Sequence, residues 1–398
     1  MRLKNILIFG CIFLVIFTIV SVVSAKLLLK KVEESTVVYK KIDNKEIEEL
    51  LKSTSDEDTQ VDIYKDEEED KNNLEDEEDI SVAKSNEENV SSKTVLSLLG
   101  EIDLSGQVSN NLNFDYVQGI KKVYNNTLVS DFAYANFVDN ISEDATIDTN
   151  SKNLAGKNAT NFLRALSLSA VSIASDNMLN YGMDSFNTTV EKIKSENIYV
   201  AGKKDEPVYF KKGDTLIAII STNSVIKAGV DYNGASISTY SKENVLKNIK
   251  EAKKNASFVI VDFHWGNESA YGVTDNMRQM AIFAIENGAD MVIGTHAAGV
   301  YPIVTYNNKP IIYSLGSFIS DSDLYVKKEG FIFNLTIDKD KVEKLEMLPI
   351  YVNNKQEVLL FNDYSKEMSD EYLEQFNKWN IDNSLNSTIE NNKIVINF

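Results

Sequence analysis

Cysteine, histidine and proline are scarce in this chain of 398 residues, which has one, two and four of them. The single cysteine, Cys11, excludes a disulfide within the chain. It does not exclude export, because secreted proteins with large cores often contain few cysteines. Lipidation of Cys11 is disfavoured, since little apolar sequence precedes it. The scarcity of histidine leaves only His264 and His296 for any imidazole-based site.

Basic residues are too few to balance the acidic ones. The chain has 41 lysines and arginines against 60 aspartates and glutamates, a formal charge of -19. About 22 of the acids, but only about seven lysines, lie between Glu33 and Glu88, so the charge belongs to one segment rather than to the fold. We expect no nucleic-acid partner, because phosphate binding requires a basic face.

An uncharged apolar run, Asn5–Ala25, lies near the N-terminus. About 20 residues at a 1.5 Å rise span the ~30 Å hydrocarbon core of a membrane. Arg2 and Lys4 precede the run and favour a cytoplasmic N-terminus. Residues 1–31 are therefore predicted to form a cytoplasmic tip and a transmembrane signal anchor, giving a single-pass protein of the cell membrane with an extracellular C-terminal domain. A cleaved signal peptide, with VSA at 23–25 as the cleavage site, is the alternative.

Residues 32–92 are polar and strongly acidic, with DEDTQVDIYKDEEEDKNNLEDEED at 56–79. Such a segment buries too little apolar surface to offset its chain entropy, and its like charges repel. It is predicted to be a disordered acidic stalk that lifts the following domain off the membrane. Calcium binding by the clustered carboxylates is less favoured, because the ordered Asp and Gly spacing of a calcium loop is missing.

Short apolar runs alternate with helix-period segments in residues 93–352, which predicts one α/β domain with parallel or mixed sheets. Asp275 and Ser241 are expected to cap two helices, and a third helix is expected to begin at Asp184. The predicted strands are Thr94–Leu99, Ser130–Phe137, Leu168–Ala174, Leu216–Ser221, Phe258–Phe263, Met291–Gly294, Phe331–Ile337 and Leu345–Val352, with a hairpin around Asn307-Asn308. Residues 353–398 are expected to be a C-terminal extension made of a helix from Glu367 and a short tail.

Polar side chains follow several of these strands, and in α/β sheets such positions collect at one edge. They are Glu101, Asp103, Asp176, Asn177, His264 and His296. The two histidines at equivalent strand ends suggest a metal site. A structural interpretation stays open, in which His264 bonds backbone at the strand ends and Trp265 fills a packing gap.

Six blocks, in order, resemble those of the CapA/PgsA family, the bacterial poly-γ-glutamate capsule synthesis proteins that are relatives of calcineurin-like metallophosphoesterases. The blocks are LLGEIDLSG (98–106), YANFVDNIS (134–142), VSIASDNMLNYGMDSF (171–186), FHWGNE (263–268), ENGADMVIGTH (286–296) and KPIIYSLGSF (309–318). The resemblance implies a metallophosphoesterase-like layered α/β/β/α sandwich, here preceded by a transmembrane helix and a stalk. It further implies a role in capsule or surface-polymer biosynthesis or export. Partners would be the membrane, other capsule-assembly subunits or an anionic surface polymer.

The chain departs from the family's pattern at most of its metal-ligand positions. The family's opening aspartate is Glu101, its ANLE glutamate falls on Val138, and its NNH histidine on Asn177. The second histidine of its His-Pro-His motif falls on Ala298, and the YSLGNF asparagine is Ser317.

The remaining candidate metal ligands are Glu101, Asp176, Asn177, His264 and His296, with Asp103 as a further oxygen donor. This set could hold one ion, whereas a metallophosphoesterase-type clamp needs two. We therefore expect a non-catalytic accessory or scaffold protein, a pseudoenzyme. The alternatives are a surface metal-dependent hydrolase with a reduced one-metal site and a surface-binding module unrelated to capsule. The sequence assigns no catalytic residue, and it leaves open whether one divalent metal ion or none is bound.

Overall fold

The computed structural model describes residues 82–84, 93–127, 129–142, 151–203, 206–212, 215–267, 272–297, 299–322 and 327–398. All of these belong to the compact unit Lys41–Phe398. The predicted transmembrane anchor lies outside the described residues, as does the predicted stalk apart from 82–84. Within the described ranges, no helix combines the length and the apolar character needed to cross a membrane.

One sheet is built around parallel strands that carry the histidine motifs. Its strand order is β1 (Val82–Lys84), β8 (Val208–Lys212), β9 (Thr215–Asn223), β10 (Phe258–His264), β11 (Met291–Thr295), β13 (Lys309–Ile312) and β12 (Ile303–Tyr306). Strands β9, β10, β11 and β13 are parallel neighbours, whereas β8 pairs antiparallel with β9. Every residue of β10 is buried, as expected for a central strand covered on both faces.

The second sheet carries the N-terminal strand of the domain at its centre. Its order is β18 (Asn386–Glu390), β19 (Lys393–Asn397), β16 (Lys341–Val352), β15 (Glu329–Asp338), β2 (Lys93–Ile102), β3 (Phe132–Phe137), β6 (Ala170–Ser172) and β7 (Tyr199–Ala201). Strand β14 (Ser317–Ile319) also pairs with β2, and β17 (Val358–Leu360) pairs with β16. Strands β4 (Asn140–Ile141) and β5 (Leu154–Ala155) form a small separate ladder.

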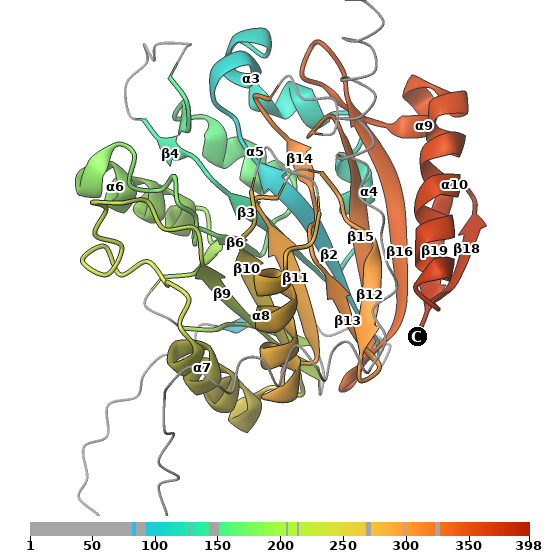
Figure 1. Cartoon of the computed structure of the whole chain (residues 1–398). Helices are drawn as coiled ribbons and strands as arrows, with labels where there is room; N and C mark the ends of the chain where they lie inside the picture. Colours follow the sequence, from blue (N-terminus) through green and yellow to red (C-terminus); the bar gives the residue numbers. More distant parts are fainter. Residues whose placement is uncertain are drawn as a thin grey trace, which may run out of the picture. The chain divides into compact units, whose positions relative to one another are not determined.

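The two sheets pack face to face, and helices cover their outer faces. One apolar cluster joins Leu98 and Tyr134 of the second sheet to Ile260 of the first. Helices α7 (Lys242–Asn255) and α8 (Asp275–Glu286) bury their apolar faces against the first sheet, where α8 crosses β10 and β11 (Figure 1). A third cluster buries the outer face of β3 and β6 against helices α5 (Ala159–Ala165) and α6 (Gly182–Ser195) and the turn η1 (Tyr116–Ile120). The expected layered α/β fold is confirmed.

Helix starts follow local capping chemistry, and two of the three expected starts differ from those in the structure. Ser241 caps α7 as predicted, since its side chain accepts from the Asn244 N–H. Helix α8 is capped by Thr274, whose hydroxyl accepts from the Met277 N–H, so Asp275 is the first helical residue instead of the cap. Helix α6 begins at Gly182, two residues before the predicted Asp184.

The C-terminal residues complete the second sheet, and the expected short tail is wrong. Short helix α9 (Phe361–Tyr364) and α10 (Lys366–Asp382) are followed by the β18–β19 hairpin, which adds to the edge of β16 (Figure 1). Tyr372 and Phe376 of α10 pack on Phe331, with ring centroids 4.9 and 5.1 Å away. Asn391 and Asn392 both have positive φ, which suits a tight hairpin turn.

Candidate metal site at the strand ends

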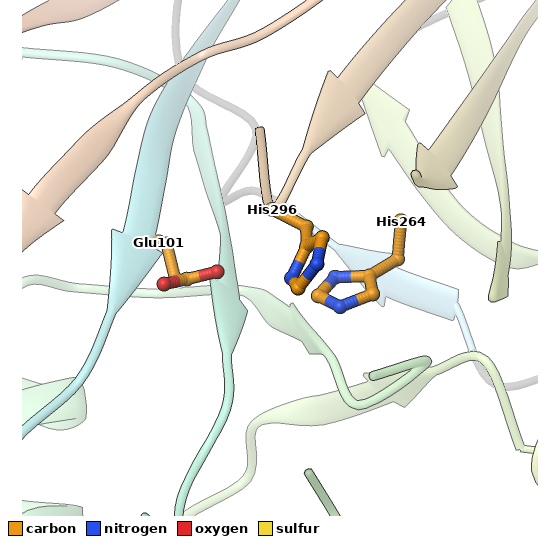
Figure 2. Close-up of side chains that lie close together, drawn as sticks. All are labelled: Glu101, His264 and His296. Carbon is orange, nitrogen blue, oxygen red and sulfur yellow. The ribbon is translucent and has the colours of Figure 1, made fainter. Parts of the chain in front are cut away.

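The candidate site lies where strands of both sheets end. Glu101 is near the end of β2, His264 is the last residue of β10, and His296 directly follows β11. One ligand atom from each residue lies within 4.8 Å of the other two, and all three residues are buried. In Figure 2 the His296 ring lies between the Glu101 carboxylate and the His264 ring. The sequence prediction that strand-end residues converge is therefore confirmed for these three.

His264 is oriented by side chains on two neighbouring elements. Its Nε2 lies 3.0 Å from Asp176 Oδ1, and its Nδ1 lies 3.4 Å from Thr295 Oγ1. The ring is 0% exposed. These contacts contradict the structural interpretation in which the ring bonds backbone. A carboxylate behind one ring nitrogen commonly fixes the orientation of a metal-binding histidine, so Asp176 can support an ion without being its ligand.

Trp265 has the structural role that the sequence suggested. The indole is 1% exposed, stacks on Phe263 with centroids 4.7 Å apart, and donates to the Tyr313 carbonyl at 2.8 Å. Gly294 makes room for it, because a Cβ there would lie 2.2 Å from Trp265 Nε1. The retained tryptophan therefore supports the strand that carries His264 and contributes no ligand.

His296 has a backbone conformation that is unusual for a residue with a side chain. Its φ is 76°, and such strain is most often found at functional sites. Its ring centroid lies 4.4 Å from that of His264, and its Nδ1 is 3.7 Å from Asp176 Oδ1. Burial lowers the pKa of His296 to about 3, helped by electrostatic interactions with His264, Lys327 and Lys227 and opposed by Asp176. The imidazole is thus neutral at pH 7 and can offer a lone pair.

Asp176 joins both histidines to a lysine. Burial alone would raise its pKa, but the hydrogen bond and charge of His264, followed by His296 and Lys227, hold the pKa of this carboxyl well below its usual range. Its Oδ2 lies 3.0 Å from Lys227 Nζ, so each carboxylate oxygen has a cationic or imidazole neighbour. Asp176 is therefore ionised at neutral pH and balances the positive groups around it.

Asn177, the other candidate ligand from this block, is engaged elsewhere. Its Oδ1 accepts from Lys227 Nζ at 2.7 Å and from Asn180 Nδ2 at 3.3 Å. The structure thus brings Glu101, His264 and His296 together. Asp176 contacts this group through its hydrogen bond with His264, whereas the Asn177 amide is bonded to Lys227. Ala298, the position of the missing histidine, lies outside the described residues, and Val138 is a buried apolar side chain.

Two lysines at the site were missed by sequence reasoning. Lys227 lies in the loop after β9, and Lys327 Nζ lies 3.7 Å from Glu101 Oε1 with side chains only 6% and 8% exposed. Neither position follows a strand end directly, and the sequence has many lysines, so no local signal distinguished them. Their positive charges weaken the electrostatic attraction of the site for a divalent cation.

Asp103 and Asp139 form a neighbouring acidic pair. Asp103 Oδ1 accepts from the backbone N–H and hydroxyl of Ser105 at 3.0 and 2.6 Å, which is a turn-forming role. Asp139 is fully buried, and burial followed by the charge of Asp103 raises its pKa well above the usual range. Asp103 and Glu101 line a polar cavity of about 160 Å³ that Lys327 and Asn177 also line. This cavity gives solvent access to Glu101.

A buried hydrogen bond between the sheets lies beneath the site. Tyr134 of β3 donates to Asp262 Oδ2 of β10 at 2.6 Å, and Ser221 donates to the same oxygen at 3.0 Å. Burial raises the pKa of Asp262 to about 6, although these two hydrogen bonds oppose the rise. Because Glu101 belongs to one sheet and His264 to the other, this bond helps to set the separation of the candidate ligands.

Comparison with known proteins agrees with the resemblance found in the sequence. The family model described as bacterial capsule synthesis protein PGA_cap matches residues 95–322. The "PGA biosynthesis protein CapA" of Bacillus subtilis (strain 168) is 25% identical over 252 residues, which cover 60% of this chain and 65% of that protein. The "Capsule biosynthesis protein CapA" of Bacillus anthracis is 22% identical over 280 residues, covering 65% of this chain and 68% of that protein.

The chain thus spans about two thirds of the length of these relatives. Among solved structures, the crystal structure of TT1561 of Thermus thermophilus is similar at 10% identity and a TM-score of 0.36, covering 61% of this chain and 98% of that one. That likeness is too weak to carry an argument. The family model, in contrast, covers more than half of the chain, and the two curated relatives carry CapA names. The chain therefore belongs to the family of bacterial capsule synthesis proteins, PGA_cap.

Proposed function

We propose that this protein serves the assembly or export of a capsule or surface polymer of the poly-γ-glutamate type, as a membrane-anchored accessory or scaffold outside the cell. Membership of the PGA_cap family and the names of the two relatives support the polymer class. The N-terminal apolar run supports the anchor and the extracellular location. Its partners would be the membrane, other capsule-assembly subunits or the anionic polymer itself.

The observation that carries the accessory role is the small ligand set. Glu101, His264 and His296 offer one carboxylate and two imidazoles from buried positions within 4.8 Å of one another. This donor set fits a single ion such as Zn²⁺, Mn²⁺ or Fe²⁺. When bound, such an ion would act as a Lewis acid toward an anionic group, and it would also tie the two sheets together through β2 and β10.

A two-ion hydrolytic clamp is not supported by the surrounding residues. Asp176 and Asn177, the other predicted ligands, are bonded to Lys227, and Val138 has no lone pair to offer. We therefore assign this chain to binding rather than to turnover.

The test is a paired measurement on the full-length protein purified in mild detergent. Bound Mn, Zn, Fe and Ca are counted per chain in the wild type and in His264→Ala. Release of product from phosphoesters and from poly-γ-glutamate is followed in the same samples. We expect about one ion per chain, lost in the variant, and no hydrolysis above that of the variant. Metal-dependent hydrolysis that His264→Ala abolishes would refute the accessory role.

The close approach of Glu101, His264 and His296 also favours a second candidate, a surface hydrolase that works with one ion. In that case the double variant His264→Ala/His296→Ala loses all activity. A double variant with full activity would remove this candidate. The two functions are thus separated by one set of proteins and one pair of assays.

A further inference from the structure

Lys227 occupies a three-oxygen cup beside the candidate metal site. Its ammonium group lies 3.0 Å from Asp176 Oδ2, 2.7 Å from Asn177 Oδ1 and 3.3 Å from Asn180 Oδ1. An ammonium has three N–H donors, so these three acceptors satisfy it completely. The lysine is 39% exposed, whereas the carboxylate that it meets is 6% exposed. The cup is therefore built around a cation that belongs to the chain.

The loop that carries Lys227 is fastened to the site by hydrogen bonds. Ser224 donates its backbone N–H to the His264 carbonyl at 2.9 Å. Tyr232 Oη accepts from the Lys227 N–H at 3.4 Å and donates to the Asp176 carbonyl at 3.2 Å. Because both ends of this loop are tied to site residues, the ammonium is held in place instead of sampling solvent as a typical surface lysine does.

The acceptors around the ammonium are also good ligands for a hard divalent cation. One carboxylate and two amide carbonyls are the oxygen donors that Mn²⁺, Mg²⁺ and Ca²⁺ take in proteins. Asp176 bonds His264 through Oδ1 and Lys227 through Oδ2, so the cup is separated from the histidine pair by only one carboxylate. In centres with two metal ions, the ions lie about 3.5–4 Å apart and share such a bridging group.

We propose that Lys227 is a built-in cation that fills a second cation position, so that the centre accepts at most one divalent ion, at Glu101, His264 and His296. The proposal deepens the one-ion centre above and rests on it only for that first ion. A second metal ion is excluded because its ligands are taken and because the ammonium repels it. The same ammonium keeps Asp176 paired when no metal ion is present.

The experiment replaces Lys227 and counts ions. Lys227→Met keeps the length of the side chain and removes its charge, and Lys227→Arg keeps the charge. Full-length proteins in mild detergent are equilibrated with Mn²⁺, and bound Mn²⁺ per chain is measured. We expect Lys227→Met to bind one equivalent more than the wild type, and Lys227→Arg to bind the same as the wild type. Lys212→Met is the matched control, because Lys212 pairs at 2.8 Å with Asp131, which precedes the start of β3 instead of lying at the strand ends that carry the predicted ligands, and it should gain no ion.

The difference between variant and wild type separates this inference from the function proposed above. One ion in the wild type and two in Lys227→Met support both this inference and the one-ion centre. No ion in the wild type and one in Lys227→Met show that Lys227 occupies a cation position, but they refute an ion at Glu101, His264 and His296. Equal counts in wild type and Lys227→Met overturn the inference.

If Lys227→Met is too unstable to purify, its refolding is followed with and without Mn²⁺. We expect Mn²⁺ to raise its melting temperature by an amount on the order of 5 °C more than that of the wild type. Failure of Mn²⁺ to restore folding would also overturn the proposal.

Discussion

The Tyr134–Asp262 hydrogen bond allows a quantitative test of how the two sheets are held in register. Tyr134 lies in the second sheet and Asp262 in the first, both are 0% exposed, and their oxygens are 2.6 Å apart. Tyr134→Phe removes the hydroxyl and nothing else. At pH 8, Asp262 is ionised because its pKa is about 6, so the lost bond is one to a charged acceptor.

A hydrogen bond to a charged group contributes about 1.5–3 kcal/mol. Ser221 still donates to the same oxygen at 3.0 Å, so the carboxylate keeps a hydrogen-bond donor in the variant. We therefore expect Tyr134→Phe to lower the free energy of unfolding by about 2 kcal/mol at pH 8. At pH 5 the acceptor is a neutral carboxylic acid, and the loss should fall to about 1 kcal/mol. Urea unfolding, followed by tryptophan fluorescence, measures both values.

The control is the same change in an Asp262→Asn background. There the acceptor is neutral at every pH, so Tyr134→Phe should cost about 1 kcal/mol at both pH 5 and pH 8. A loss below about 0.5 kcal/mol at pH 8, or an equal loss in both backgrounds, would mean that the bond does not have the charge-assisted strength inferred from its burial.

Three further changes test other parts of the structure. Asp139→Asn should raise the free energy of unfolding at pH 8 and change it little at pH 4. Burial raises the pKa of Asp139, so the native state keeps a proton that the unfolded state loses as the pH rises, and the loss of stability that this causes in the wild type is absent from the variant. Urea unfolding at the two pH values checks this, and a variant less stable at pH 8 would contradict it. His296→Gly should abolish ion binding yet be about 1 kcal/mol more stable than His296→Ala, because glycine adopts a φ of 76° without strain; calorimetry and metal counts decide, and equal stabilities would show that the backbone there is relaxed. Deletion of residues 384–398 should lower the melting temperature and promote aggregation seen by light scattering, since it leaves the edge of β16 unpaired; an unchanged melting curve would mean that β18 and β19 add nothing to the sheet.

The fold followed from local patterns wherever the signal was contained in a few neighbouring residues. The buried strands β10 and β11 were predicted from their runs of apolar residues. Asn307-Asn308 predicted the β12–β13 hairpin, and both residues have positive φ there. The same dipeptide at Asn391-Asn392 carries the β18–β19 hairpin, and there the prediction of a tail was wrong. Its strands are short, and the pairing of β19 with β16 joins residues about 50 positions apart, which no local pattern encodes.

The sequence indicated the candidate ligands of the site but not the lysines that lie beside them. His264 and His296 stood out because they lie at the ends of apolar runs and are the only histidines. Lys227 and Lys327 did not stand out, because a lysine in a loop looks the same whether it faces solvent or a buried carboxylate. The contacts that decide between these outcomes, such as that of Tyr232 with the Asp176 carbonyl, join residues 56 positions apart.

The sequence by itself determined the α/β class, the strand-end histidines and the losses at Val138 and Asn177, because hydrophobic period and residue chemistry are local properties. Only the tertiary structure decided that Glu101 of one sheet meets the histidines of the other, that Asp176 orients His264, and that Lys227 fills the oxygen cup. Those outcomes depend on distances between segments far apart in the chain. Packing of the two sheets sets these distances, and no short stretch of sequence encodes them.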